Sequence, residues 1–414
     1  MVKLSVRSSV MLGGAGILAL GTLKLVLLKC RAGPKGYRKS PPASATKKKR
    51  SGEITRDRYT KKKVPENIDV VLVGSGISSL YCAALLSKLN YRCLVLEQHY
   101  VAGGCTHCFI DKGWEFDTGV HYVGRVEKYG EDVRVASVHN VALLLTPRCR
   151  ILVAGYLLDL VTLNDTDKVK FEKLGNEADG WVYDVIKIGD KLHPLRASRK
   201  AFVEDLAKAF PEEREAVEKY LDMVIKCNKS ADLHFFGKLF HPVFSWLIDK
   251  TIGSTFNKLA CRTVQDVLDE LFVSNELKAI LSGQFGDYGM PPSTASFFIH
   301  AGIVAHYLDG GFYPVGGPQK IAEALIPIIE SKGGRVLVNA EVEKIITEGG
   351  KATGVKMKSG DVISAPITVS GAGAEATEGL LNGWNGSPKA DLKDGISHVY
   401  LFLGIEGEEL GEER

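Results

Sequence analysis

Two short apolar runs separated by a helical pattern stand out in the first quarter of the chain. Residues 68–73 are apolar except for one aspartate, and residues 92–96 form a second run after an initial arginine. Between them, leucine and alanine recur at helical spacing over residues 80–86. Continuous apolar runs of this length are typical of strands that are buried on both faces. The pattern therefore predicts a strand–helix–strand unit within a parallel sheet.

The turn between the first strand and the helix has the residue types that bind a dinucleotide. In Gly74-Ser75-Gly76, the first glycine permits a sharp turn, and the second has no Cβ to keep the backbone away from phosphates. The helix N-terminus then offers N–H groups and its positive dipole end to an anion. Glu97 lies 23 residues after Gly74, where its carboxylate can accept ribose hydroxyls and would repel a 2′-phosphate. We predict nucleotide binding here; an ordinary strand–helix connection is the alternative.

One position of the glycine pattern differs from the usual form. Ser79 stands where a third glycine normally lets the helix and the strand pack closely. Because serine adds only a hydroxymethyl group, we expect a slightly wider contact between helix and strand. Ser75 and Ser79 are therefore kept among the predicted cofactor-binding residues.

The N-terminal region combines a hydrophobic segment with a basic one. Residues 10–28 are apolar or small except for Thr22 and Lys24, and 19 helical residues span about 28 Å, close to the hydrocarbon thickness of a bilayer. We expect residues 1–28 to be a retained membrane anchor, with a signal segment as the alternative. Residues 29–64 contain 14 lysines and arginines and two acids, which predicts a flexible basic linker. The basic residues favour a position of the linker in the cytosol or against anionic headgroups. The sequence leaves open on which side of the membrane the linker lies.

Charge is distributed unevenly over the 414 residues. The net charge is +4, but residues 1–63 contain 17 basic and 2 acidic residues, so residues 64–414 carry −11. Hydrophobic residues make up 45% and charged residues 25% of the chain, as in folded globular proteins of two or three domains. An acidic body is a poor partner for nucleic acid, and we exclude that class.

Two of the eight cysteines form a C-x-x-C pair, Cys105 and Cys108. A zinc site needs a second ligand pair at similar spacing, which the sequence does not contain. A redox disulfide normally lies at the start of a helix, whereas this pair follows two glycines in a predicted loop. We expect no metal site and favour packing of the cofactor loop, with metal or disulfide chemistry as the alternatives.

Further glycine-rich segments extend the pattern and lead to a family. Gly103 and Gly104 follow the ribose acid after a short loop, and residues 114–122 read WEFDTGVHY. Residues 310–317 read GGFYPVGG and precede a predicted helix. With these segments the chain resembles the phytoene-desaturase and carotenoid-isomerase flavoproteins, in which such segments surround one FAD.

The resemblance implies an α/β fold with a Rossmann-like FAD-binding domain that is split in sequence, an inserted α+β substrate domain and an N-terminal hydrophobic helix. We expect residues 335–342 to form a strand at whose end the backbone of Val342 meets the adenine. Gly371 would end a strand that returns beneath the cofactor. The predicted parts are the anchor or signal (1–28), the linker (29–64), the FAD-binding domain (65–144 and 309–380), the substrate domain (145–308) and a C-terminal region (381–414).

The resemblance also concerns the end of the chain. Members of the family continue well beyond the equivalent of residue 414 and contact the flavin a second time there. We therefore expect residues 381–414 to begin an incomplete C-terminal region, and expect the chain in this form to bind flavin loosely or not at all.

The implied function is a membrane-associated, FAD-dependent oxidoreductase of the endoplasmic reticulum that reduces a C=C bond of a retinoid or related polyene lipid. NAD or NADP is a candidate electron donor. A carotenoid isomerase or desaturase is one alternative, and a truncated, non-catalytic nucleotide-binding or membrane scaffold protein is another. His121, Tyr122 and Tyr313 are weak candidates for the proton donor, each with a structural role as its alternative. Motifs of hydrolases and metalloproteases are absent from the sequence.

The aromatic segment 233–247 has two interpretations. It is apolar with a few polar interruptions and too short to span a bilayer. One interpretation is a buried helix that is broken at Pro242. The other is a patch that dips into the surface of a membrane.

Overall fold

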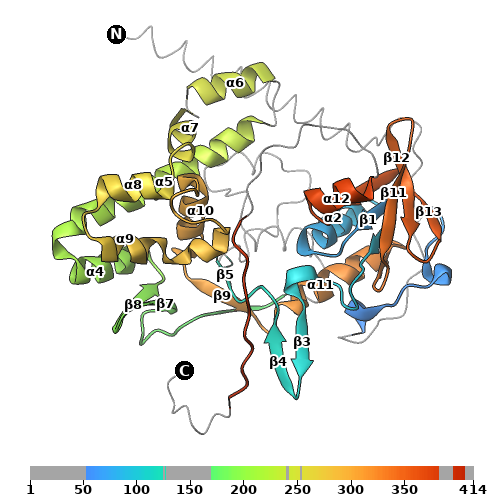
Figure 1. Ribbon diagram of the computed structural model, residues 1–414, viewed down its shortest axis with the longest axis horizontal. Coiled ribbons are helices and arrows are strands. Elements are labelled where there is room, and N and C mark those ends of the chain that lie inside the picture. The colour runs from blue at the N-terminus through green and yellow to red at the C-terminus, as the bar shows by residue number, and fades with distance from the viewer. Residues whose placement is uncertain are drawn as a thin grey trace, which may run out of the picture.

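A computed structural model describes residues 53–124, 126, 169–238, 242–251, 254–381 and 395–405 of the chain. The predicted anchor or signal segment and most of the linker lie outside these residues. In Figure 1 a part built around a parallel sheet lies on the right and a helical part on the left, with short strands between them. No helix within the described ranges has both the length and the apolar character needed to cross a membrane.

The parallel sheet is assembled from two distant segments of the chain. Its four strands are β1 (Val70–Val73), β2 (Cys93–Leu96), β10 (Arg335–Leu337) and β14 (Ile367–Ser370), in the order β10-β2-β1-β14. All neighbouring strands are parallel. The predicted strand–helix–strand unit and the predicted return of the chain beside it are therefore confirmed, and the order is typical of a Rossmann-like sheet.

Helices cover one face of this sheet. Val70 and Leu72 on the central strand are fully buried against α2 (Ile77–Lys88) and α11 (Gln319–Glu330). Because successive side chains of a strand point to opposite faces, the residues between them pack on the other side.

An antiparallel sheet covers the second face. It contains β11 (Val342–Glu348), β12 (Lys351–Met357) and β13 (Val362–Ser364), and its buried side chains pack with Val71 and Val73. The sheet is therefore buried on both sides, which explains why its strands read as continuous apolar runs.

The predicted strand over residues 335–342 is wrong in one respect, because the structure divides it into β10 and β11. Asn339 adopts a left-handed conformation with φ of +50°, which asparagine tolerates better than most residues. The N–H groups of Asn339 and Ala340 donate to the carbonyls of His99 and Glu97 (2.9 and 2.7 Å). The chain thus leaves the parallel sheet at this turn and enters the antiparallel one.

In the predicted substrate domain, the described strands come before the helices along the chain. Helix α8 (Val264–Leu271) begins with a capping box in which Thr263 and Asp266 each bond the backbone N–H of the other. The remaining elements are β3 (Cys108–Asp111), β4 (Trp114–Asp117), β5 (Val123–Gly124), β6 (Phe171–Lys173), β7 (Val182–Ile188), β8 (Lys191–Arg196), α4 (Arg199–Ala209), α5 (Arg214–Gly237), α6 (Pro242–Lys250), α7 (Ser254–Ala260), α9 (Asn275–Ser282), α10 (Phe297–Tyr307), β9 (Gly311–Pro314) and α12 (Ala374–Leu380).

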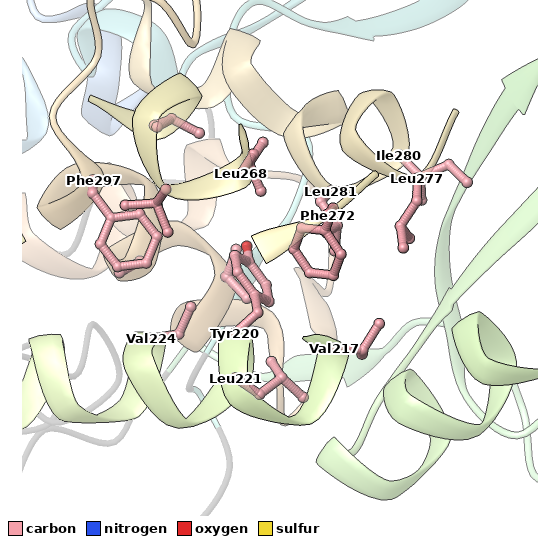
Figure 2. Close-up of a cluster of buried hydrophobic side chains, with 14 of the residues drawn as sticks. Val217, Tyr220, Leu221, Val224, Leu268, Phe272, Leu277, Ile280, Leu281 and Phe297 are labelled. Carbon is pink, nitrogen blue, oxygen red and sulfur yellow. The ribbon is translucent and has the colours of Figure 1, made fainter. Parts of the chain in front are cut away.

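The helical core is organised around one face of α5, as Figure 2 shows. Val217, Tyr220, Leu221 and Val224 recur at helical spacing and are fully buried. They pack against side chains of α8, α9 and α10 and of the segments between those helices.

Helix α5 ends at Gly237 and α6 begins at Pro242, so a break does occur in the segment 233–247. The interpretation of this segment as a buried helix is wrong for α6, because Val243, Trp246 and Leu247 are exposed.

A histidine is buried in this core between two tyrosine hydroxyls. His300 on α10 is 2% exposed, and its Nε2 lies 2.6 Å from the hydroxyl oxygen of Tyr220. Its Nδ1 lies 3.3 Å from the hydroxyl oxygen of Tyr288. Burial disfavours the charged imidazolium and lowers the pKa of His300 to about 4.

Stability should therefore fall in mildly acidic solution. Below its ordinary pKa, His300 binds a proton in the unfolded chain but not in the folded one, so acid favours unfolding. Between about pH 7 and pH 5 the free energy of unfolding should decrease by about 2 kcal/mol from this group. Urea denaturation at several pH values measures the change. His300→Gln should reduce the pH dependence, whereas replacement of the exposed His121 should not; equal profiles for wild type and His300→Gln would contradict the assignment.

Candidate cofactor site

The glycine turn leaves open space at the N-terminus of α2. Gly74 has φ of +88°, and its N–H donates to the carbonyl of Leu96 (2.8 Å). A Cβ placed on Gly76 would meet no atom of the described chain within 4 Å. Among the described residues no side chain caps this helix end, and Ile77 and Ser78 are exposed. The N–H groups and the positive dipole end of the helix thus face a space that an anionic pyrophosphate fits.

Glu97 lies beside this helix end and turns back toward it. Its Oε2 accepts hydrogen bonds from the backbone N–H and the hydroxyl of Ser75 (2.8 and 2.7 Å). Its Oε1 accepts one from the N–H of His99 (2.9 Å). Ser75 is fully buried, so the carboxylate anchors the turn as well as the tip of β2.

The remaining capacity of Glu97 fits a sugar hydroxyl. A carboxylate offers about four acceptor positions, and three donors from the described chain use three of them. One position remains on Oε1, and a second ribose hydroxyl would need to replace the hydroxyl of Ser75. The residues therefore fit the adenosine and pyrophosphate of a dinucleotide, while contact with that ligand stays a prediction.

The second glycine pair packs directly on the first. Gly103 and Gly76 form an isolated parallel β-bridge, and the N–H of Gly103 donates to the hydroxyl of Ser75 (3.1 Å). A Cβ on Gly104 would lie 2.9 Å from the Cα of Gly76. Close backbone approach within the protein explains the glycine at 104, and its predicted role at the ligand stays a prediction.

Ser79 is accommodated by a glycine directly after the neighbouring strand β14. Its side chain is 3% exposed and lies where a Cβ on Gly371 would be, so any side chain at 371 would overlap the Ser79 hydroxyl. The N–H of Gly371 donates to the carbonyl of Val73 (2.8 Å). The hydroxymethyl group fills the space that Gly371 leaves free, and the expected wider contact between helix and strand stays a prediction.

Val342 lies at the edge of the same region. It is the first residue of β11 and packs in one core cluster with Val73 and Leu96, the last residues of β1 and β2. The structure thus brings the predicted adenine-binding residue to the sheet edge that carries Glu97. Its contact with adenine stays a prediction.

The C-x-x-C pair has a structural environment. Cys105 is exposed and Cys108 is buried, and both are free thiols. The Cys108 thiol donates to Oδ1 of Asp117 (3.1 Å), and the Tyr313 hydroxyl donates to Oδ2 of the same carboxylate (2.7 Å). Burial, with Asp117 adding to it, raises the pKa of Cys108 to about 12. Within the described ranges no group of three or more potential ligand side chains could hold a metal ion.

Tyr122 lies in a cluster of tyrosines and acids between the two parts of the protein. Its hydroxyl donates to Oδ2 of Asp184 (2.8 Å), and its ring centroid is 5.1 Å from that of Tyr307. The rings of Tyr307 and Tyr183 stack at 5.5 Å. Burial and Asp184 raise the pKa of Tyr122 well above its ordinary value. Burial of the Asp287 carboxyl group, together with repulsion from Asp184, raises the pKa of Asp287.

The three predicted proton donors lie in separate surroundings. Tyr122 bonds Asp184, Tyr313 bonds Asp117, and His121 is exposed with its ring 6.3 Å from that of Tyr400. Asp184 was not a candidate from the sequence, because it lies 62 positions after Tyr122 in an ordinary strand and only the fold joins them. Asp117 lies within the WEFDTGVHY segment, so its position in that motif was an available signal.

Comparison with curated proteins connects this geometry with a family. The human protein named all-trans-retinol 13,14-reductase is 36% identical over 377 residues, which are 89% of this chain and 57% of that protein. The predicted family resemblance is confirmed. A zebrafish (Danio rerio) relative named inactive all-trans-retinol 13,14-reductase is 30% identical. The match covers 87% of this chain and 58% of that protein. The chain thus spans little more than half of these relatives.

More distant matches are consistent with the same family. Prolycopene isomerase 1 of an Oncidium hybrid is 26% identical over 76% of this chain and 50% of that protein. A family model described as an NAD(P)-binding Rossmann-like domain matches residues 72–135. Among solved structures, an oxidoreductase from Methanosarcina mazei is 17% identical over 76% of this chain and 61% of that one, with a TM-score of 0.46. A score this low supports no conclusion.

Proposed function

We propose that this chain contributes the cofactor-binding and substrate-binding parts of an FAD-dependent oxidoreductase that reduces a C=C bond of a retinoid or related polyene lipid. The observation that carries the proposal is the open N-terminus of α2 beside Glu97, in a chain whose retinol-reductase relatives match it over most of its length. Bound and reduced FAD would supply a hydride to one carbon of the double bond. The second carbon then needs a proton from the protein or from water.

Some of the described residues would bind the cofactor, and another would supply the proton to the substrate. Gly74, Gly76 and the N–H groups of α2 would hold the pyrophosphate, and Glu97 would accept a ribose hydroxyl. A 2′-phosphate would be repelled by Glu97, so NADP does not suit this site. FAD is preferred to NAD here because of the family resemblance, and we propose NAD or NADP only as the donor that reduces it. Loss of NADH or NADPH absorbance upon addition of the flavin-loaded protein would identify the donor.

Tyr122 is our proposed proton donor, because Asp184 fixes its hydroxyl between the two parts of the protein. Its raised pKa makes the phenol a weak acid, so it would donate only to a strongly basic carbon centre. Tyr122→Phe should slow C=C reduction about 100-fold, within the range for loss of a general acid, and leave the flavin spectrum unchanged. Tyr183→Phe is the matched control, since it removes a hydroxyl from the same cluster without removing the bond to Asp184. Equal rates in wild type and Tyr122→Phe would reject this role.

Purified chain tests the proposed function directly. Protein that carries or takes up FAD should absorb in the flavin bands. After anaerobic photoreduction, added all-trans-retinol should give a product that is heavier by two hydrogen atoms in mass spectrometry. Colourless protein that takes up no FAD would reject the proposal for this chain. A product of unchanged mass would instead indicate isomerisation, as the name of the Oncidium relative suggests.

A non-catalytic protein is the second candidate. The observation that favours it is the zebrafish relative named inactive, which matches this chain over a similar length. FAD binding without any reduction of a retinoid or another polyene would support this candidate.

We also propose that residues 1–28 hold the protein in the endoplasmic reticulum membrane. The support is the apolar segment 10–28, followed by the basic linker. Carbonate washing of microsomes measures it: protein that stays in the pellet supports an integral anchor. Protein released into the supernatant would contradict the proposed anchor.

A further inference from the structure

Helix α6 (Pro242–Lys250) exposes large apolar side chains along one face. Val243, Trp246 and Leu247 are 63%, 59% and 50% exposed, and their spacing of three and four residues places them on the same side of the helix. Ser245 is 8% exposed and points toward the protein. An ordinary surface helix exposes mainly polar residues, so this exposed apolar face is unusual.

The position of α6 leaves this face accessible. The helix packs against α5 and α7 and lies at the upper margin of the helical part in Figure 1, away from the parallel sheet and the cofactor site. Its nine residues would extend only about 14 Å, less than half of a hydrocarbon core, so the helix can lie on a bilayer but cannot span one.

Charge around α6 differs in sign from the rest of the body. Residues 223–264 contain six lysines and arginines and two acids, a net charge of +4, within a segment 64–414 that carries −11. Lys250 is exposed and follows Trp246 by four residues and Leu247 by three, so it flanks the apolar face. Lys238 is exposed directly after α5, and Lys258 is exposed in the last turn of α7. A lysine there can lay its stem along lipid and keep its ammonium group among headgroups.

We propose that the face of α6 formed by Val243, Trp246, Leu247 and Lys250 docks on the surface of a lipid bilayer that contains anionic headgroups. The three apolar side chains enter the boundary between headgroups and acyl chains, where tryptophan is favoured. The lysines contact the headgroups. Because the surrounding body is acidic, this region is oriented toward an anionic bilayer by charge as well as by apolar contact.

Depth-dependent fluorescence quenching tests the docking in the full chain. Phosphatidylcholine vesicles with phosphatidylserine and brominated acyl chains should quench part of the tryptophan emission, and Trp246→Phe should remove most of the quenched part. Trp114→Phe is the matched control, because Trp114 is 43% exposed on the β3–β4 hairpin. The measurement reports the depth of one side chain, whatever else holds the chain on the vesicle. Equal quenching in wild type and Trp246→Phe would overturn the proposal.

Charge reversal provides a second measurement. Lys250→Glu should reduce the equilibrium constant for docking at least about fivefold when phosphatidylserine is present, and much less on pure phosphatidylcholine. Lys351→Glu, an exposed lysine at the start of β12, should leave docking unchanged. An equal effect of the two reversals would contradict a specific role of α6.

The outcomes separate this inference from the proposed enzymatic function. FAD binding and retinoid reduction in detergent should not change in Trp246→Phe. A chain that binds FAD but shows no quenching at Trp246 would reject only the docking surface. Concentration-dependent dimerisation that Leu247→Ser abolishes, without quenching by lipid, would assign the face to a second copy of the chain and overturn the membrane proposal.

Discussion

Gly371→Ala is expected to lower the free energy of unfolding by about 1–3 kcal/mol and to weaken FAD binding. The added Cβ would overlap the Ser79 hydroxyl, which is buried between α2 and β14. Relief of the overlap requires the Ser79 hydroxyl to rotate out of its buried position or α2 to move away from the sheet, and overpacking of this kind typically costs about 1–3 kcal/mol. A movement of α2 would also displace the helix N-terminus that would hold the pyrophosphate. Urea denaturation and titration of flavin fluorescence measure the two effects.

A second substitution shows whether the overlap is the cause. Ser79→Gly restores the usual third glycine, and by itself should cost no more than about 1 kcal/mol. Combined with Gly371→Ala it should recover most of the lost stability, a coupling of about 2 kcal/mol. Gly76→Ala is the contrasting control, because its Cβ would meet nothing within 4 Å in the described chain. It should leave stability within about 0.5 kcal/mol of the wild type while weakening FAD binding. Additive effects of the two substitutions at 79 and 371 would contradict the explanation.

Glu97→Ala should weaken FAD binding at least about 100-fold, close to 3 kcal/mol, and also destabilise the folded chain. The carboxylate accepts three hydrogen bonds, two of them from the fully buried Ser75. Removal leaves those donors without an acceptor, which costs about 1–3 kcal/mol for a buried group. The ribose also loses the acceptor position on Oε1. Isothermal titration with FAD and urea denaturation of the apoprotein separate the two contributions.

Two variants define this interpretation further. Glu97→Gln keeps one acceptor oxygen and should retain part of the stability, but it no longer repels a 2′-phosphate. Glu348→Ala removes an exposed acid at the end of β11 and should change neither quantity. If Glu97→Ala bound FAD as tightly as the wild type, the ribose assignment would be wrong.

Much of the fold around the site could be predicted from local patterns. The apolar runs at 68–73 and 92–96 contain β1 and β2, because a strand that is buried on both faces carries apolar side chains at nearly every position. Pro242 is the first residue of α6, a position where its missing N–H and fixed φ suit the start of a helix. These features depend on a few neighbouring residues, so the sequence is sufficient for them.

The errors and omissions have a common physical origin. The run 335–342 contains no proline or glycine at which a strand must end, and its division at Asn339 depends on bonds to the backbone of Glu97 and His99. The partner of Tyr122 is Asp184, from a hairpin far along the chain. Both depend on contacts between segments that no local pattern joins.

By itself the sequence determined the strand–helix–strand unit, the glycine turn with its acid and the family resemblance, because each rests on short-range periodicity or on a motif. The resemblance, not a local pattern, implied that two distant segments form one domain. Only the tertiary structure decided that Gly371 makes room for Ser79, that Glu97 turns back onto Ser75, and that α6 presents its apolar face outward. The physical reason is that packing and burial are properties of pairs of surfaces, and the second surface in each pair comes from a remote part of the chain.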